Sequence, residues 1–337
     1  MAWQKQASWE PEAGEQRWRY YCIKMGMRLL CGQSTMRGRG IKKRKGTQEQ
    51  IAGGEDSRRL RITNSMEEAV AEKDFVVLAV PSPFIRSTAR NMKPYVVKHQ
   101  KLINVAKGIE ETTLKTLSEQ IEEELPMADV AVLSGPSHAE EVGRGLPTTC
   151  VVGAKTKETA EYLQKMFMNE TFRVYTSPDI LGIEVGGALK NVIALAAGIA
   201  DGLGYGDNTK AALITRGIAE IGRLGIQMGG KMESFTGLTG IGDLIVTCAS
   251  VHSRNRKAGY LIGQGKTMQE AMDEVKMVVE GVYSAKAAMK LAEKYEVSMP
   301  IIEQVNQVLF KGKDAAKAVN ELMLRDGKIE HSDLPWE

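Results

Sequence analysis

A lysine within an otherwise apolar stretch has the clearest potential for chemistry in this sequence. Lys190 lies in GGALKNVIALAAGIA, residues 186–200, which would have almost no polar face as a helix. Burial disfavours the charged ammonium group and lowers the pKa of a lysine toward that of a useful proton donor. The alternative is a lysine that reaches solvent from the edge of the helix. The pattern alone leaves both interpretations open.

Two further segments carry groups that can bind an oxygen or an anion. Lys107, in NVAKGIE, follows an apolar run and precedes a glycine, which places it at the end of a strand, either facing a ligand crevice or in a solvated loop. In SGPSHAEEV, residues 134–142, Gly135 and Pro136 stand where a strand turns into a helix. Backbone N–H groups at such a turn can hold an anion, although an isolated turn is weak support.

The stretch GLTGIGDLIVTCASVHSRNRKAG, residues 237–259, combines an acid with a candidate phosphate clamp. The glycines that allow close backbone approach around Asp243 are Gly237, Gly240 and Gly242. A hydroxyl, a guanidinium and an amide follow one another at Ser253, Arg254 and Asn255. This set suits a phosphate, which arginine binds through paired hydrogen bonds, although a charged helix start has the same appearance.

Strands that alternate with helices must position these residues. Apolar runs rich in β-branched residues predict buried strands within 74–82, 101–108, 129–137, 148–154 and 172–177. Helical patterns intervene at 65–74, 113–125 and 158–169. Such alternation predicts an α/β domain with a mostly parallel sheet, whose ligands bind beyond the carboxyl ends of the strands. Lys107 and the turn at 134–139 are both expected at those ends.

After Pro178 the pattern changes to long helices that continue to about Leu324. We therefore predict an α/β domain over residues 61–178 and a second, all-α domain over residues 179–330. A chain of 337 residues is long enough for two domains with substantial cores. Its 43% apolar and 26% charged residues are typical of a soluble globular protein.

Composition argues against several other classes of protein. Four cysteines without a CxxC pair and four dispersed histidines indicate neither a disulfide framework nor a metal site. No apolar run is expected to span a membrane and the N-terminus lacks a signal-peptide core, so we expect a cytoplasmic protein without membrane insertion. Residues 1–61 carry 14 Lys/Arg against 6 Asp/Glu. A basic arm permits nucleic-acid binding, but a compositionally foreign segment explains it equally well, and we expect no nucleic-acid partner.

Two lysines, an aspartate and a phosphate clamp beside a dinucleotide-binding fold indicate the reduction of a small phosphorylated ketone. The nicotinamide would supply a hydride. A lysine ammonium would protonate the carbonyl oxygen as negative charge develops there.

From about residue 61 to its C-terminus, the chain resembles the bacterial type of NAD(P)-dependent glycerol-3-phosphate dehydrogenase. The matching strings, in chain order, are LAVPS, NVAKGIE, VLSGPSHAEEV, EVGGALKNVIALAAGIADGLGYGDNTKAALITRG, FTGLTGIGDLIVTCASVHSRNR and VVEGVYSAKAAMKLA. The resemblance implies a Rossmann-like domain followed by a helical domain, NAD or NADP as cofactor and a homodimer. It also implies interconversion of dihydroxyacetone phosphate and sn-glycerol 3-phosphate for glycerophospholipid synthesis.

Residue roles follow from the same resemblance. Lys190 would be the proton donor and acceptor, supported by Lys107, Asp243 and Thr247. The further substrate contacts would be Gly135, Ser137, Ser253, Arg254 and Asn255. The cofactor contacts would be Lys107, Ala139, Arg254, Val278 and Glu280.

The chain departs from this family in its first sixty residues. The family begins with a buried strand, the loop Gly-x-Gly-x-x-Gly and a helix, whereas residues 6–35 read QASWEPEAGEQRWRYYCIKMGMRLLCGQST. We therefore assign residues 1–60 to an aberrant segment that replaces the start of the dinucleotide-binding domain. The determinant that separates NAD from NADP falls within it, so the sequence leaves that preference open.

A change of reading frame explains the aberrant segment. Back-translation of residues 6–33, read one base out of register, permits GVLGAGSWGTALAVLLYKNGHEVTLWS, which contains the missing strand, glycine-rich loop and helix. Some positions allow little choice, since Trp9–Glu10 and Met25–Gly26 each force a glycine. In the third frame, residues 45–57 permit KEHKNKLPGVKI, which resembles the next loop of the family. Resequencing this part of the gene tests whether the change is a sequencing error or a lesion.

Three alternatives remain beside the dehydrogenase. The first is a related dehydrogenase of another small substrate. The second is a catalytically impaired remnant whose helical domain still folds, and the third is a nucleic-acid binder that uses its basic arm. Salt-dependent retention on DNA that is lost on deletion of residues 1–60 would favour the last.

Overall fold

The five predicted strands form in the computed structural model, which describes residues 5–10, 28–33, 60–63, 65–327 and 329–330. They are β4 (Phe75–Leu78), β5 (Lys101–Asn104), β6 (Asp129–Ser134), β7 (Thr148–Ala154) and β8 (Phe172–Ser177). The first three are shorter than predicted at their carboxyl ends, because the chain leaves the sheet there to form the turns of the site.

The strands belong to one sheet of eight, in the order β3-β2-β1-β4-β5-β6-β7-β8. Every neighbouring pair is parallel except β6 and β7, which are antiparallel. The first six strands follow the doubly wound order of dinucleotide-binding sheets, whose ligands lie beyond the carboxyl ends of the strands. The predicted fold class, a mostly parallel Rossmann-like sheet followed by helices, is confirmed.

Strands also form within residues 1–63, where the sequence predicts no strand of the sheet. β1 (Lys5–Glu10) lies between β2 (Arg28–Gln33) and β4, and β3 (Leu60–Thr63) pairs with β2. The expectation is therefore wrong for these segments. Strands pair through backbone groups, so a segment without proline can cover the edge of β4 whatever its side chains. The connections at 11–27 and 34–59, where the glycine-rich loop is expected, lie outside the described residues.

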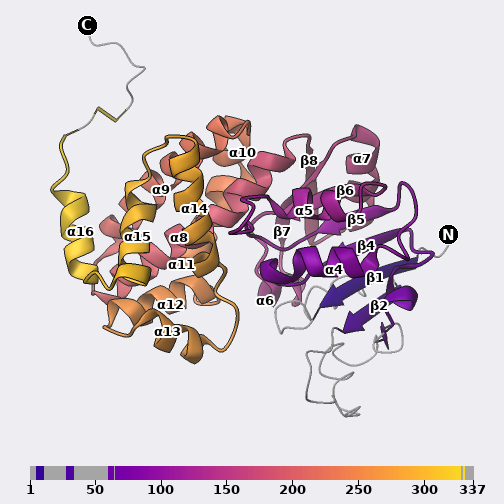
Figure 1. Ribbon diagram of the computed structural model, residues 1–337, viewed down its shortest axis with the longest axis horizontal. Helices are drawn as coiled ribbons and strands as arrows, with labels where there is room; N and C mark the ends of the chain where they lie inside the picture. The colour runs from indigo at the N-terminus through magenta and orange to yellow at the C-terminus, as the bar shows by residue number, and fades with distance from the viewer. Residues whose placement is uncertain (1–4, 11–27, 34–59, 64, 328, 331–337) are drawn as a thin grey trace, which may run out of the picture.

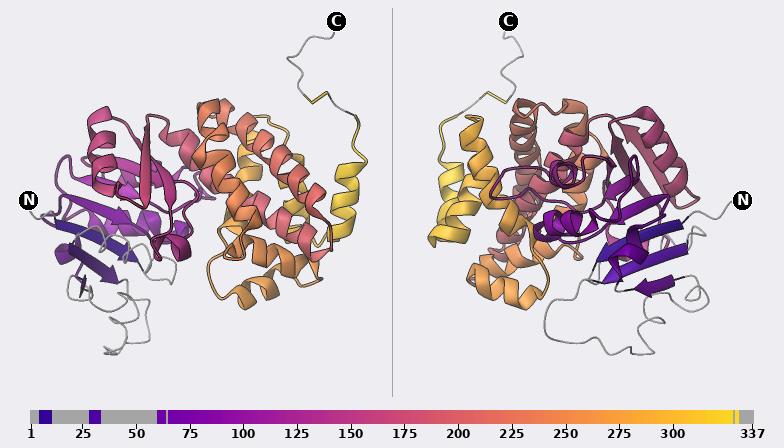
Figure 2. Two further views of the ribbon diagram at one scale, coloured as in Figure 1. Left: turned by 180° about the vertical axis from the view of Figure 1, so that it is seen from behind. Right: turned by 45° about the vertical axis from the view of Figure 1, so that its right-hand side comes forward.

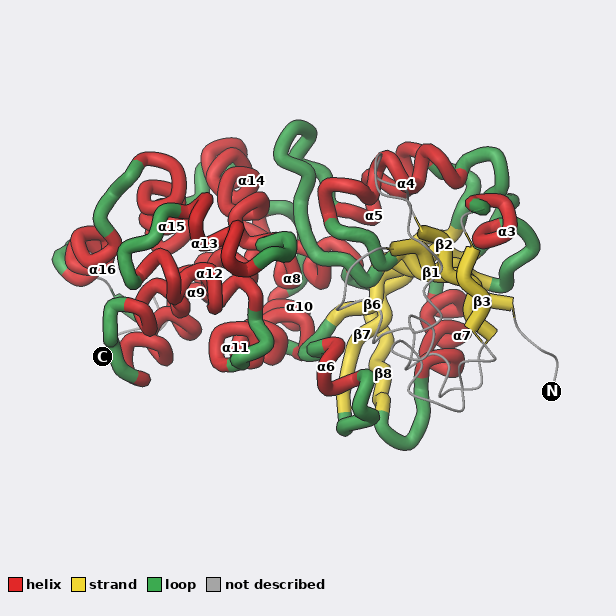
Figure 3. Tube along the Cα trace, turned by 90° about the horizontal axis from the view of Figure 1, so that it is seen from below, coloured by secondary structure: helices red, strands yellow, loops and turns green. Residues whose placement is uncertain are grey.

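Helices cover both faces of the sheet, as Figure 3 shows. On one face, Val76 and Leu102 pack in a core with α3 (Met66–Val70), α4 (Ile85–Met92) and α5 (Leu117–Glu124). On the other, Phe75 and Ile103 pack with α7 (Lys157–Phe167). Alternate residues of one strand face opposite sides, so continuous apolar runs serve both cores. Side-chain caps at Ser65, Thr116 and Thr156 begin three of these helices, each with an oxygen that accepts a backbone N–H.

The helical part lies beside the sheet and surrounds α8 (Ile180–Gly202), whose central residues are buried (Figures 1 and 2). The other helices of this part are α9 (Asp207–Gln227), α10 (Met232–Thr236), the π-helical turn η3 (Leu238–Gly242), α11 (Asp243–Ala249), α12 (Arg254–Gly263), α13 (Met268–Val275), α14 (Glu280–Lys294), α15 (Pro300–Lys311) and α16 (Ala315–Met323). All of them pack on α8 except α13, which packs on α12, and α16, which packs on α15 and α12. α8 and α12 cross in close backbone contact. A Cβ on Gly198 would lie 2.1 Å from the Arg256 carbonyl oxygen, and one on Gly259 would lie 2.2 Å from that of Leu195.

The length of α8 corrects the expectation that no apolar run could span a membrane. Ile180–Gly202 is long and apolar enough to do so by length and composition. The fold surrounds it, however, since 94% of its most apolar window is buried within the protein. This helix is apolar on all sides because other elements pack on all sides of it.

Candidate active site

Lys190, Asp243 and Lys107 meet where the sheet and the helical part join. The Lys190 ammonium nitrogen lies 2.6 Å from Asp243 Oδ1 and 2.6 Å from Thr247 Oγ1. The Lys107 ammonium lies 2.6 Å from the other Asp243 oxygen, Oδ2. Lys190 is 5% exposed, so the interpretation of a buried, partnered lysine is confirmed and that of a lysine reaching solvent is wrong. Lys107 likewise binds a carboxylate instead of standing free in a loop.

Three elements that are distant in the sequence bring these groups together. Lys107 follows the end of β5, Lys190 lies in the middle of α8, and Asp243 is the first residue of α11. Glycine allows the close approach before α11, because a Cβ on Gly240 would lie 2.0 Å from the Phe235 carbonyl oxygen. Asp243 therefore points back toward α8 instead of into solvent, and it is 2% exposed.

Burial and charge determine how this cluster is ionised. Burial lowers the pKa of Lys190 to about 8; the Asp243 carboxylate opposes this shift and the Lys107 charge adds to it. Burial acts to raise the pKa of Asp243, but the two lysines outweigh it, and the pKa lies below its usual value. Asp243 is therefore ionised at neutral pH, and Lys190 can hold or release a proton near physiological pH.

The turn at residues 134–139 supports Lys107 through a carbonyl group. The Gly135 oxygen accepts a hydrogen bond from the Lys107 ammonium at 3.1 Å and another from Ser137 Oγ at 3.1 Å. Gly135 has a φ of 149°, and a Cβ there would lie 3.0 Å from Cys150 Cα, so the turn requires glycine. The sequence directed attention to the N–H groups of this turn, whereas the structure shows its carbonyl oxygen bound to the lysine.

The Ser253–Arg254–Asn255 run begins α12, and the Ser253 and Asn255 side chains form hydrogen bonds that stabilise this helix start. Ser253 caps the helix by accepting the Arg256 N–H at 3.2 Å. Asn255 Oδ1 accepts the Gly281 N–H at 2.8 Å, and its amide nitrogen donates to Asn191 Oδ1 at 3.0 Å. Both alternatives of the sequence therefore have support at this position, because the run starts a helix and also borders the cleft.

Of the predicted cofactor contacts, Glu280 joins the two parts of the protein. It is the first residue of α14, and it accepts the Ser82 N–H at 3.1 Å and also the Ser82 hydroxyl. Ser82 lies in the turn that follows β4, so Glu280 fixes that turn against the helical part. Ala139 begins α6 (Ala139–Val142), and Val278 lies two residues before Glu280.

A cleft of about 270 Å³ brings most of the predicted residues to one place. The predicted residues that line it are Lys107, Ser137, Ala139, Lys190, Thr247, Ser253, Arg254, Asn255 and Glu280. Gly135, Asp243 and Val278 are absent from its lining; the first two act behind it, as partners of lysines. Its remaining wall includes residues that follow β4 and β5, at the carboxyl edge of the sheet, as expected for a ligand site of this fold.

The cleft-lining residues that sequence reasoning missed include three with polar side chains of interest: Asn191, His138 and His252. Asn191 gives a local signal, because it follows Lys190 in an apolar helix and its side chain must find partners when buried. The two histidines come close only in the fold, with ring centroids 6.2 Å apart. Burial, followed by the charge of Lys190, lowers the pKa of His138.

The fold and the site together define a two-domain, dinucleotide-dependent oxidoreductase. Its sheet has the strand order that binds dinucleotides, and a buried lysine of lowered pKa stands in the cleft between the sheet and a helical domain.

Comparison with known proteins names the family. Residues 35–160 match the model of the NAD-dependent glycerol-3-phosphate dehydrogenase N-terminus, and residues 179–320 match that of the C-terminus. A glycerol-3-phosphate dehydrogenase [NAD(P)+] of Agathobacter rectalis is 69% identical over 278 residues, which are 82% of this chain and 83% of that protein. The relative from Bacillus subtilis is 54% identical over 275 residues, or 81% and 80% of the two chains. The chain belongs to the NAD-dependent glycerol-3-phosphate dehydrogenase family.

A solved structure agrees with this membership. The glycerol-3-phosphate dehydrogenase of Coxiella burnetii superposes with a TM-score of 0.86 and 30% identity, and the match covers 96% of this chain and 99% of that one. The N-terminal family match begins at residue 35, inside the segment that the sequence assigned as aberrant.

Proposed function

We infer that this chain interconverts dihydroxyacetone phosphate and sn-glycerol 3-phosphate with NAD or NADP as the hydride carrier. The observation that carries the inference is the Lys190–Asp243–Lys107 cluster at the wall of the cleft, in a chain of this family. Two ammonium groups and one carboxylate leave a net positive charge beside the cleft. Such a site favours a phosphorylated substrate and the negative charge that develops on a carbonyl oxygen during reduction.

In the reduction, Lys190 is the proton donor. Its ammonium group gives a proton to the carbonyl oxygen of the ketone, and in the reverse direction the neutral amine takes that proton from the hydroxyl group. Asp243 holds Lys190 in place with Thr247, and it holds Lys107 through its second oxygen. Lys107 keeps a positive charge beside the reacting oxygen and so stabilises the oxyanion.

The phosphate end of the substrate is assigned to the start of α12. Arg254 lines the cleft there and offers a planar fork of donors, and helix N-termini attract anions. Asn255 positions this helix start through Asn191 and Gly281, so we assign it to the support of the phosphate site as well. Gly135, Ser137 and Ser253 complete the proposed substrate contacts.

Part of the expected cofactor site lies within the described residues. Val80, Pro81, Val105 and Ala106 form an apolar wall beside the lysines, which suits a nicotinamide ring. When bound, the dinucleotide supplies the hydride. Ala139, Val278 and Glu280 are the other proposed contacts. The pyrophosphate contacts are expected in residues 11–27, outside the described residues.

Two chains serve to test the function. One is the present chain, and the other is the restored-loop variant, in which GVLGAGSWGTALAVLLYKNGHEVTLWS replaces residues 6–33 and KEHKNKLPGVKI replaces residues 45–57. The measurement is NADH or NADPH formation with sn-glycerol 3-phosphate, beside glycerol as a control that lacks the phosphate. Turnover of sn-glycerol 3-phosphate without turnover of glycerol supports the function. No turnover of sn-glycerol 3-phosphate by either purified, folded chain would contradict it.

Arg254→Ala should raise KM for dihydroxyacetone phosphate by roughly 10- to 150-fold and change kcat much less, because a lost hydrogen bond to a charged group costs about 1.5–3 kcal/mol. Steady-state kinetics at varied ketone and fixed NADH give the result. Arg256→Ala is the matched control, since Arg256 pairs with Asp201 at 2.7 Å on the same helix and does not line the cleft. An unchanged ketone KM with a weakened NADH affinity would assign Arg254 to the cofactor alone.

The rate should depend on pH with opposite signs in the two directions. Reduction needs the protonated Lys190, so kcat/KM for the ketone should fall as the pH rises through about 8, the pKa to which burial lowers this lysine. Oxidation needs the neutral amine and should rise over the same interval. Rate profiles between pH 6 and 10 check the prediction, and Lys190→Arg, which does not titrate there, should abolish the inflection. An inflection that survives this substitution belongs to another group.

Further proposals concern location and assembly. We propose that the enzyme is a cytoplasmic homodimer without membrane insertion. The last point is supported by the burial of Ile180–Gly202, the helix of the described residues that is long and apolar enough to span a membrane. Light scattering after size exclusion measures the oligomeric state, and a monomeric mass would contradict the dimer.

A further inference from the structure

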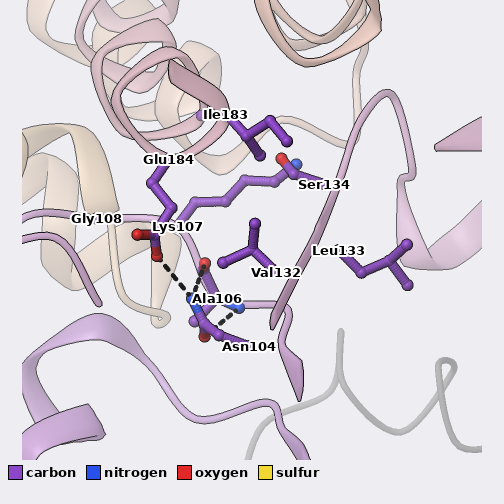
Figure 4. Close-up of a pocket in the computed structure, with 10 residues that line it drawn as sticks. Asn104, Ala106, Lys107, Gly108, Val132, Leu133, Ser134, Ile183 and Glu184 are labelled. Carbon is purple, nitrogen blue, oxygen red and sulfur yellow. Dashed lines mark hydrogen bonds between the residues drawn. The ribbon is translucent and has the colours of Figure 1, made fainter. Parts of the chain in front are cut away.

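A buried carboxylate outside the reacting cluster touches the segment that carries Lys107. Glu184 lies on α8, six residues before Lys190, and is 7% exposed. Its Oε1 accepts hydrogen bonds from Asn104 Nδ2 at 3.3 Å and from the Ser118 N–H at 3.0 Å. Its Oε2 accepts the Ser118 hydroxyl. Figure 4 shows the Glu184 side chain descending from its helix to the Asn104 amide.

Asn104 shapes the turn that leads to Lys107. It is the last residue of β5; its side-chain oxygen accepts the Ala106 N–H at 3.0 Å, and its amide nitrogen donates to the Ala106 carbonyl at 3.1 Å. A side chain that bonds the backbone two residues further on turns the chain out of an extended path. The turn ends at Lys107, whose ammonium then reaches Asp243.

The same helix also makes room for the stem of Lys107. A Cβ on Gly187 would lie 3.5 Å from Lys107 Cγ and 3.3 Å from Ser134 Oγ, so α8 passes close to this side chain. One helix thus holds Lys107 at three levels. Glu184 holds the turn 104–107, and Gly187 borders the aliphatic part of the Lys107 side chain. Lys190 binds the same carboxylate, that of Asp243, as the Lys107 ammonium group does.

The partners of Glu184 are all uncharged. Among the described residues, Glu184 forms no ion pair. A carboxylate buried without a cation is costly unless hydrogen bonds replace its water. Here those bonds go to the turn before Lys107 and to the first turn of α5, so the cost is offset by contacts that join α8 to the carboxyl end of β5.

We propose that Glu184 is a positioning residue for Lys107: by holding the Asn104 amide, it fixes the turn 104–107 so that the Lys107 ammonium stands between Asp243 and the cleft. Among the described residues, no hydrogen bond joins Glu184 to Lys107 or to Lys190, whose ammonium groups are bound elsewhere. Its proposed effect on Lys107 is therefore indirect and passes through Asn104. The inference rests on the proposed function for its effect on turnover, although its structural effect on Lys107 is measurable without turnover.

The kinetic test is a double-mutant cycle in whichever of the two chains turns over. Glu184→Ala should lower kcat roughly 10- to 100-fold, because small misplacements of a catalytic group have effects of this size, with KM for NADH within about twofold. The double variant Glu184→Ala/Lys107→Ala should have the same rate as Lys107→Ala alone. Glu184 is proposed to act through Lys107, so its loss should have no further effect once Lys107 is absent. Glu184→Gln keeps an oxygen for Asn104 and Ser118 and should recover most of the rate.

Glu220→Ala is the matched control for a purely structural carboxylate. Glu220 is also buried and accepts the N–H groups of Ile301 and Ile302 at the start of α15, away from the cleft. The substitution Glu220→Ala should lower the melting temperature and leave kcat per folded molecule unchanged. If Glu184→Ala behaves in the same way, or if its effect multiplies with that of Lys107→Ala, the proposal is overturned.

Amine labelling of the full chain tests the structural effect alone. Brief treatment with acetic anhydride, followed by mass spectrometry, gives the acetylation rate of Lys107 relative to Lys317, an exposed lysine of α16. Release of Lys107 from its partners should raise this ratio about 10-fold in Glu184→Ala, the equivalent of one lost charge-assisted hydrogen bond, and leave it unchanged in Glu220→Ala. A ratio equal to that of the parent chain would overturn the proposal. No turnover in any chain, with the labelling result intact, would count against the proposed function only.

Discussion

Replacing Lys190 with methionine should lower kcat for both directions of the reaction by about 10²–10⁴-fold, the usual contribution of a general acid or base. Methionine has nearly the length of lysine and no proton to give, so the substitution tests the proton and not the packing. Removal of the ammonium also takes one partner from Asp243, whose other oxygen stays bound to Lys107. The measurement is single-turnover NADH oxidation with saturating dihydroxyacetone phosphate, in whichever of the two chains is active.

Lys210→Met is the matched control for this experiment. Lys210 also pairs with an aspartate, Asp201, at 2.9 Å, but it does not line the cleft. The Lys210→Met variant should be somewhat less stable than the parent chain and should keep the same kcat. Near-normal turnover of Lys190→Met would remove Lys190 from the mechanism, whatever its burial.

The present chain should bind NADH at least about 150-fold more weakly than the restored-loop variant, which corresponds to the loss of two hydrogen bonds to charged groups. A pyrophosphate needs glycines that let the backbone approach and a helix start with unpaired N–H groups. Residues 6–20 contain one glycine, Gly14, and carry Glu10, Glu12 and Glu15 where the anion would bind. Turnover of the present chain should fall accordingly.

Calorimetric titration of both purified chains with NADH measures the difference. The two chains share residues 61–337, so the helical domain should have the same fold in both. Its thermal unfolding transition, measured in each chain, is the internal control. Micromolar binding by the present chain with ordinary turnover would show that its N-terminal segment is a working cofactor site. It would also show that the reading-frame argument is wrong.

Local patterns in the sequence determined the strands β4 to β8, three helices of the sheet domain and the helical character of the chain after Pro178. β7 and β8 have the predicted bounds, because their apolar and β-branched runs are as long as the strands themselves. Lys190 could be singled out because a charge within an apolar stretch such as residues 186–200 requires a partner wherever that stretch is buried. The family was equally visible, since long strings of residues around the site match it.

Only the tertiary structure decided which groups meet. Lys107 and Asp243 are 136 residues apart, and their contact depends on how α8 and α11 pack beyond the end of β5. The roles of Asn255 and Glu280 in joining elements, and that of Glu184 beneath Lys107, rest on contacts of the same kind. β1 and β2 formed against expectation for a related reason. Side-chain patterns report the environment of one segment, whereas strand pairing and buried ion pairs depend on a neighbour that the chain brings back from far away.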